Sequence, residues 1–398
     1  MTAVTYTAAG QVFIINQFTS ASRPQLRTLT FSVTALAVMT FSLFSLTVIA
    51  TWSFLAMRHH APTWSANPLN NALACAHQGL ESRPNRTLVS YNRSHNKMSA
   101  GSQPQIPQKR QPSLAASRPY AILAIILPWV GVLATLIWAS CTFGFGKETG
   151  DVSQAVGASV LHQGKAITWT SKESSSAQPR WTVVLIGIAF TFATQLAFTF
   201  ALHCTELLVN ATRAERLWRR AGGNLGGRLY SVQRDSDVGT SDPIGTQRKR
   251  KTKVKGAGID SNAIKDAFMA WETVSLFIFK IIIPWAFGES VRVNYNRDSS
   301  VSIVLWANCL LLLMAFTFSV ALLGTYLCFK RPSEPQPVAY GHMQTLVDLV
   351  NEWGEEDEDL YWGDKGHIAY CEDGEIRRAG TAGRSEEVGL IRMEARYR

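Results

Sequence analysis

The residues best suited to chemistry lie within one apolar run, from Trp181 to Val209. Polar side chains recur at every fourth position in the middle of this run, as Thr191, Gln195, Thr199 and His203. Residues four apart lie near one face of a helix, so this spacing predicts a polar stripe on an otherwise apolar helix. Polar groups inside a membrane helix usually face a bundle interior or a water-filled path for ions or protons. The four residues are therefore a candidate intramembrane polar face.

Two ionisable side chains, Glu206 and Lys280, lie within apolar runs or at their ends. Glu206 follows His203 by one helical turn, a spacing that suits a metal ion or a proton relay. Two ligands are too few for a metal site, and Glu206 is close enough to the end of its helix to lie at the membrane surface. An ion pair between Glu206 and Lys280 would instead remove two unpaired charges from lipid, so these residues are a candidate ion pair.

The elements that must position these residues are long apolar runs. About 20 apolar residues of helix cross the ~30 Å hydrocarbon core of a bilayer. Four runs reach that length, at residues 29–57, 120–145, 181–209 and 301–329. They predict an all-α fold: a multipass transmembrane helix bundle of four or five spans, with polar, partly disordered loops and a C-terminal amphipathic helix. We expect an integral membrane protein of the plasma membrane or an endomembrane.

Segment 261–288 decides the number of spans. It begins as an amphipathic helix and ends in a short apolar stretch, 273–288, that contains Lys280 and Pro284. A lysine at the bilayer centre costs ~2.5–3.5 kcal/mol on insertion scales, and Phe, Ile, Leu and Val residues at ~0.3–0.6 kcal/mol each roughly offset it. The stretch can therefore cross, re-enter or lie at the surface. We favour a crossing, because five spans put both basic loops and Lys330-Arg331 on one side.

The connecting segments differ in charge. The chain of 398 residues has a formal charge of +10, yet the tail at 330–398 carries nine Lys or Arg and fifteen Asp or Glu. Loop 58–119 holds eight Lys or Arg and one acid, loop 210–260 is also basic, and loop 146–180 is nearly balanced. Basic loops beside membrane spans are typical of the cytosolic side. We expect a short non-helical leader at 1–28, and both basic loops and the tail in the cytosol.

The densest basic stretch consists of Arg248, Lys249, Arg250, Lys251, Lys253 and Lys255. It predicts attraction to anionic lipid, with a nuclear localisation signal and an ordinary solvated loop as the alternatives. We expect no nucleic-acid binding, because no DNA- or RNA-binding signature accompanies the charge. Loop 58–119 also carries glycosylation sequons at Asn85 and Asn92, which would be used only in a lumen.

The tail carries one apolar helical face, made by Met343, Leu346, Val347, Val350 and Trp353. This pattern predicts an amphipathic helix at 341–353, which would dock on another surface of this chain or on a protein partner. The composition after Leu360 is typical of a loop.

Several blocks from residue 261 onward carry a resemblance, and they read SNAIKDAFMAWETVSLFIFKIIIPWAFG, KRPSEPQPVAYGHMQTLVDLVNEW, LYWGDKG and RRAGT. They resemble a group of uncharacterised multipass membrane proteins from filamentous fungi. The more specific part is PQPxxYGHxQTLxDLxxEW followed by YWGDKG, whereas the central span and its arginines are more loosely similar. The resemblance implies a fungal membrane protein with a soluble C-terminal tail, and it implies no activity and no catalytic residue.

The sequence has no nucleophile elbow, phosphate-binding glycine loop, dinucleotide fingerprint or paired zinc spacing. We therefore expect no cofactor and no metal, and an enzyme is the least favoured function. A non-enzymatic membrane-anchored scaffold or interaction protein fits the basic loops and the amphipathic tail best. A transporter or channel using the polar face of the central span is the alternative. The recurrence of IILPW, at Ile125–Trp129, as IIIPW, at Ile281–Trp285, is compatible with transport, although five such residues recur easily by chance.

Overall fold

The computed structural model describes residues 13–18, 26–31, 33–57, 68–83, 85–89, 104–107, 109–148, 164–171, 180–223, 228–230, 270–295, 301–332, 338–351, 360–371, 374–382 and 387–398. The chain divides into two compact units. Unit 1 comprises Met1–Arg58, Ile122–Leu208 and Trp271–Tyr326, and unit 2 comprises His59–Ala121, Val209–Ala270 and Leu327–Arg398. Each unit is therefore assembled from three separate stretches of sequence.

Among the described residues, five helices are long and apolar enough to cross a membrane. They are α2 (Val33–Met57), α6 (Tyr120–Phe145), α7 (Arg180–Gly223), α9 (Trp271–Ser290) and α10 (Ala307–Phe329). A helix satisfies its backbone polar groups internally, as a segment in lipid must. Hydroxyl groups follow the same rule, since the Thr47 side chain donates to the Leu43 carbonyl at 2.9 Å. The predicted multipass, mostly helical membrane fold is confirmed.

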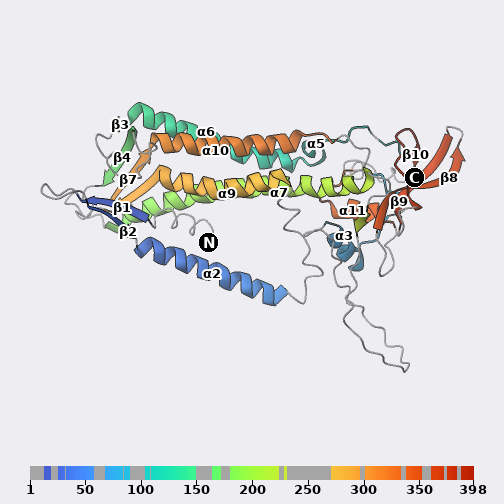
Figure 1. The fold of residues 1–398 in the computed structure, drawn as a ribbon, viewed down its shortest axis with the longest axis horizontal. Coiled ribbons are helices and arrows are strands. Elements are labelled where there is room, and N and C mark those ends of the chain that lie inside the picture. The colour runs from blue at the N-terminus through green and yellow to red at the C-terminus, as the bar shows by residue number, and fades with distance from the viewer. Residues whose placement is uncertain are drawn as a thin grey trace, which may run out of the picture. The chain divides into compact units, whose positions relative to one another are not determined.

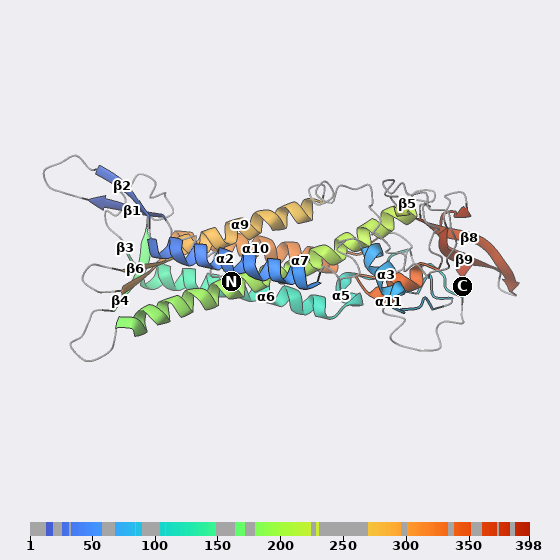
Figure 2. The same cartoon turned by 90° about the horizontal axis from the view of Figure 1, so that it is seen from below.

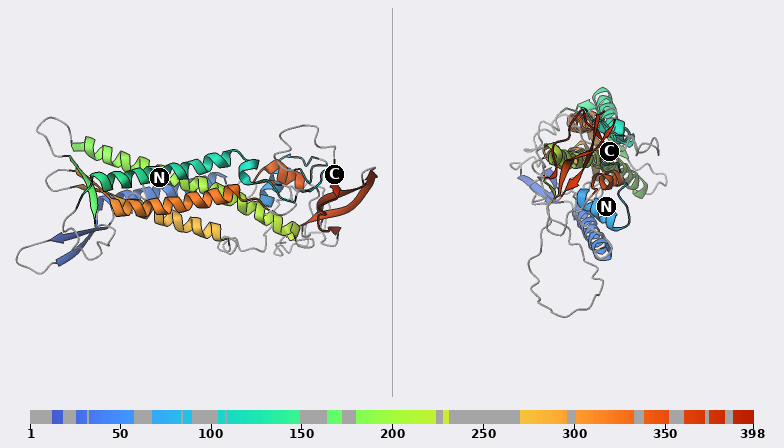
Figure 3. Two further views of the ribbon diagram at one scale, coloured as in Figure 1. Left: turned by 90° about the horizontal axis from the view of Figure 1, so that it is seen from above. Right: turned by 90° about the vertical axis from the view of Figure 1, so that its right-hand side faces the viewer.

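α6, α7, α9 and α10 run alongside one another in unit 1 (Figure 1; Figure 3, left), and four aromatic contacts connect them as a ring. The contacts that close the ring are Trp138 with Phe190 (α6–α7), Phe198 with Phe287 (α7–α9), Trp271 with Tyr326 (α9–α10) and Trp129 with Phe318 (α10–α6). The fifth helix, α2, packs least, since only 6% of its candidate span is buried, against 33–44% in the other four. The ring is therefore the packed core of the membrane part.

Two connections of unit 1 join in one antiparallel sheet, seen at one end of the helices in Figure 2. The strand order is β3 (Lys147–Glu148), β4 (Lys165–Ser171), β7 (Val301–Trp306) and β6 (Val291–Tyr295). β4 pairs with β7 from Ala166 opposite Trp306 to Ser171 opposite Val301. The sequence pattern places 301–306 in the last span, whereas the structure has a strand there. Two Val residues, one Ile and one Trp among six favour that conformation once a partner strand is present.

A second, smaller sheet begins in the predicted leader, 1–28, and extends to Phe31, so the first span predicted at 29–57 begins as a strand and is helical only from Val33. Strands β1 (Phe13–Phe18) and β2 (Leu26–Phe31) pair antiparallel, from Phe13 opposite Phe31 to Phe18 opposite Leu26.

The pairing of β4 with β7 bears on the doubtful span. β4 follows α6 and precedes α7, whereas β7 follows α9 and precedes α10. The two strands can pair only if both connections lie on the same side of the membrane, so α7 and α9 must both cross it or both fail to cross. Because α7 contains a candidate membrane span at Ala189–Arg216, we expect α9 to cross as well, in spite of Lys280 and Pro284.

Unit 2 contains a second four-stranded sheet, in the order β10 (Arg396–Tyr397), β9 (Gly374–Ala382), β8 (Leu360–Cys371) and β5 (Arg228–Tyr230). Its helices are α3 (Pro68–His77), α5 (Leu114–Ser117) and α11 (Met343–Leu349). Gln105 and Tyr397 exchange backbone hydrogen bonds of 2.7 and 2.8 Å, which join the first loop to the tail. The two segments therefore lie on the same side of the membrane, as four crossings between them require.

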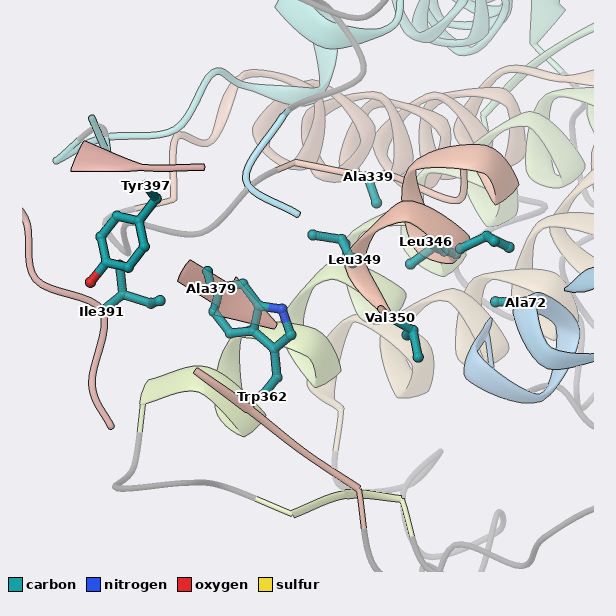
Figure 4. Close-up of a cluster of buried hydrophobic side chains, with 10 residues drawn as sticks. Ala72, Ala339, Leu346, Leu349, Val350, Trp362, Ala379, Ile391 and Tyr397 are labelled. Atoms are coloured by element: carbon teal, nitrogen blue, oxygen red, sulfur yellow. The ribbon is translucent and has the colours of Figure 1, made fainter. Parts of the chain in front are cut away.

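The core of unit 2 gathers around Trp362 and Tyr397 (Figure 4). Ala72 of α3 packs in the same cluster as Leu346 and Val350 from the α11 region. The ion pair of Arg83 with Asp348 lies in this unit too, and Asp348 is buried. Segments that are far apart in the sequence thus share one hydrophobic core.

Three segments of unit 2 differ from what the sequence pattern predicts. Residues after Leu360 form strands because cross-strand pairing and ion pairs, rather than apolar alternation, stabilise them. The loop 58–119 contains α3 and α5, which contribute buried side chains. The helix predicted at 341–353 is only Met343–Leu349, and it is buried from Thr345 to Leu349 instead of on one face, because unit 2 surrounds it.

Candidate functional site

The polar face predicted on α7 is divided by the structure. Thr191 and Gln195 are buried, with 5% and 1% of their surface exposed, Thr199 is half-buried and His203 is exposed. A step of four residues turns a helix by about 400°, so the stripe drifts by about 40° per step and leaves the buried side before His203. The Thr199 hydroxyl donates to the Gln195 carbonyl at 2.8 Å, which satisfies it within its own helix. The structure therefore keeps Thr191 and Gln195 buried and separates His203 from them.

The Gln195 side chain is buried without a hydrogen bond. Neither its amide oxygen nor its amide nitrogen has a partner among the described residues. Leaving a buried polar group unpaired costs about 1–3 kcal/mol. A bound water or polar solute would remove that cost. Gln195 is therefore the stripe residue whose side chain could still form hydrogen bonds to a bound molecule.

A small cavity lies where the four ring helices meet, and apolar groups line it. Its walls include Pro128 and Gly131 of α6, Phe198 and Leu202 of α7, Ile283 of α9 and Val320 of α10. Thr317 also lines it, and its hydroxyl donates to the Leu313 carbonyl at 3.0 Å. None of the four stripe residues is in its wall. This cavity is therefore apolar and is separate from the polar face.

The candidate ion pair is in contact. Lys280 Nζ of α9 lies 2.7 Å from Glu206 Oε2 of α7. His203 Nδ1 lies 3.0 Å from the same oxygen. The carboxylate thus neutralises the lysine charge within the spans and links α7 to α9. Glu206, Lys280 and His203 are close enough to pass a proton among them, and proton transfer is the one chemical function that their geometry supports.

Sequence reasoning missed two charged residues that hold the start of the tail. The Glu215 carboxylate, which is buried, accepts the backbone N–H groups of Ala339 and Tyr340 at 3.2 Å each. Arg118 Nη2 donates to the carbonyls of the same two residues at 3.4 and 3.3 Å. The turn is left-handed, with φ of 39° at Tyr340 and 74° at Gly341. Both residues lie beside predicted spans, so in the sequence they count only as charges of the connecting loops. Their hydrogen bonds to the tail become visible only in the structure.

The motif LYWGDKG has a structural explanation. Trp362 is 1% exposed in the core, and a Cβ on Gly363 would lie 2.3 Å from the Gly389 carbonyl oxygen. Asp364 Oδ2 accepts hydrogen bonds from Arg377 Nε at 2.6 Å and from the Tyr397 hydroxyl at 2.9 Å. The motif therefore positions side chains that stabilise unit 2.

The Asp364 group shifts the acidity of its neighbours. Its hydrogen bond to the Arg377 guanidinium raises the pKa of that side chain. Burial, together with the hydrogen bond to Asp364, raises the pKa of Tyr397 to about 12. A phenolate at Tyr397 would face a carboxylate inside the core, so the neutral phenol is the form that suits the fold.

Unit 2 is expected to lose stability as the pH rises from 10 to about 12. The folded state keeps Tyr397 protonated to a higher pH than the unfolded chain does, so the stability that this group contributes is complete below pH 10. It falls by roughly 2–3 kcal/mol by the folded pKa and above. Tyrosinate absorbance should show one late step that Tyr397→Phe removes, and Tyr370→Phe at an exposed ring is the control. An unchanged step in Tyr397→Phe would contradict the assignment.

The remaining predicted sites stay predictions. Asn85 is exposed in a turn with φ of 59°. Asn92 and the basic stretch from Arg248 to Lys255 lie outside the described residues. The described part of the predicted 341–353 segment, residues 341–351, packs within unit 2 through Leu346, Leu349 and Val350, and Trp353 lies outside the described residues.

No protein-family model matches the chain, and no curated protein and no solved structure matches it. The five apolar helices define the class: this is an integral, multipass membrane protein.

Proposed function

We propose that this protein is a non-enzymatic, membrane-anchored scaffold that presents unit 2 to protein partners. The observation that carries the proposal is the joint core of unit 2, to which the loop after the first span and the tail both contribute. Glu215 and Arg118 hold the tail's first turn by four hydrogen bonds, which gives the start of the tail a defined structure within unit 2. We also propose that the likeness to multipass membrane proteins of filamentous fungi reflects this unit, because the motif residues stabilise it.

Transport through the polar face of α7 is the second candidate. The unpaired amide of buried Gln195 favours it. The apolar cavity and the exposed position of His203 favour the scaffold instead, since neither provides a wet path through the ring.

One pair of variants separates these functions. Gln195→Ala with His203→Ala should leave a scaffold's complexes intact, whereas Asp348→Asn, which weakens the ion pair of this buried carboxylate with the partly exposed Arg83, should weaken them. The complexes are measured by cross-linking the full chain in its own membrane. Mass spectrometry then identifies the proteins that are recovered with it in fixed stoichiometry. Proton flux is measured in liposomes with an entrapped pH dye. A flux that the first variant abolishes would replace the scaffold by a transporter, and complexes that survive Asp348→Asn unchanged would contradict a role for unit 2.

A further inference from the structure

One backbone hydrogen bond in unit 2 brings two basic segments together. The Gln111 N–H donates to the Pro332 carbonyl at 3.2 Å. Gln111 lies shortly before α6, and Pro332 follows the last residue of α10, Phe329, by three positions. The bond therefore joins the approach to one span with the exit from another.

Four cationic side chains flank this bond: Lys109 and Arg110 before Gln111, and Lys330 and Arg331 before Pro332. All four are exposed. Each is at most two residues from a bonded residue, which is at most about 7 Å of extended chain. Flexible side chains of this length can therefore converge on one anionic group.

Within the part of the chain that the structure describes, three of the four cations in this basic cluster have no acidic partner. No acidic residue occurs from 104 to 121 or from 324 to 332. Among the described residues, Lys109, Arg110 and Arg331 form no ion pair. The nearby acid Glu215 is buried, and its carboxylate accepts the backbone N–H groups of Ala339 and Tyr340 instead of pairing with these cations. The positive potential of the cluster is therefore directed at the solvent or at a membrane surface.

We propose that Lys109, Arg110, Lys330 and Arg331 form a binding site for the phosphate-bearing headgroup of an anionic phospholipid. The cluster begins directly after a span of 23 residues, at the depth where headgroups lie. Basic residues there attract anionic lipid by about 1 kcal/mol each. The site is assembled by folding, because neither segment alone supplies more than two of its cations. It is distinct from the stretch at Arg248–Lys255.

The test uses the full chain in detergent with phosphatidylserine or phosphatidylcholine added, and native mass spectrometry to measure bound lipid. Lys109→Gln/Arg110→Gln/Arg331→Gln should weaken phosphatidylserine binding at least tenfold and leave phosphatidylcholine binding unchanged. The matched control, Arg248→Gln/Arg250→Gln/Lys253→Gln, removes the same charge elsewhere and should change it less than twofold. All three substituted cations of the site are exposed, so folding should be retained, and protease resistance of the tail checks this.

Half-site variants test whether the segments act together. Lys109→Gln/Arg110→Gln and Arg331→Gln should each weaken phosphatidylserine binding several-fold. The fold loss of affinity in the combined variant should be smaller than the product of the two separate fold losses. Equal losses in the site variant and the control would overturn the proposal, because they would show that only net charge matters. Binding carried by one segment alone would overturn it too. Displacement of the lipid by millimolar inorganic phosphate would show a phosphate site rather than a lipid site.

Discussion

Replacing Asp364 with alanine is expected to lower the free energy of unfolding of unit 2 by about 3–5 kcal/mol. Asp364 is buried, and its carboxylate accepts hydrogen bonds from Arg377, from Tyr397 and from the Gly366 N–H. Its removal leaves the largely buried Arg377 guanidinium with Glu375 as its remaining carboxylate partner, and it leaves the Tyr397 hydroxyl in the core without its acceptor. Hydrogen exchange of peptides from β8 and β9 in the full chain measures the loss.

Two further variants define that result. Asp364→Asn keeps an acceptor for Tyr397 but removes the charge opposite Arg377, so an intermediate loss is expected. Glu387→Ala removes an exposed acid of the same unit and should change exchange little. Exchange rates in Asp364→Ala that equal those of the control would show that the Asp364 group does not hold the sheet.

The second large effect concerns the charges between α7 and α9. Glu206→Leu leaves Lys280 without its partner in the spans, and Lys280→Leu leaves Glu206 with only its contact to His203. An unpaired charge at membrane depth costs up to about 2.5–3.5 kcal/mol, and less where a long side chain reaches the surface. Each single variant should therefore lower the thermal unfolding temperature in nanodiscs. The double variant should lie close to the wild type, because both charges are gone.

The double-mutant cycle measures the coupling between the two residues. His203→Leu is the control, because it removes a contact of Glu206 but keeps the pair with Lys280. It should shift the unfolding temperature much less than either single variant. If the Glu206 and Lys280 effects simply add, the contact contributes nothing to the bundle.

The sequence predicts the membrane part well because its signal is strong and local. A run of apolar residues is readable without knowledge of its neighbours, and α6 coincides with the predicted 120–145. In α9 the apolar residues favour a membrane span, whereas Lys280 and Pro284 disfavour one, so the local sequence alone does not decide. What decides its crossing is the pairing of β4 with β7, a contact between distant segments that no local pattern encodes.

Unit 2 was hard to predict for the same reason. Its strands β8 and β9 show no regular alternation of apolar and polar residues. Asp364, Arg377 and Tyr397 are far enough apart in the sequence that no local pattern reveals their hydrogen bonds. The prediction of one polar face on α7 fails for a different reason. Residues spaced four apart share a helix face over one step, but the drift of about 40° per step separates them over three steps. Gln195 and His203 therefore share a pattern without sharing an environment.

The hydrogen bonds between Gln105 and Tyr397 have a consequence for biosynthesis. Gln105 leaves the ribosome early and must wait while α6, α7, α9 and α10 are inserted before its partner is made. If one of these helices is left out of the bilayer, the two residues end on opposite faces and cannot meet. Closure of unit 2 therefore requires an even number of crossings between these two residues, and a chain with one helix left out of the bilayer would keep its first loop and its tail apart.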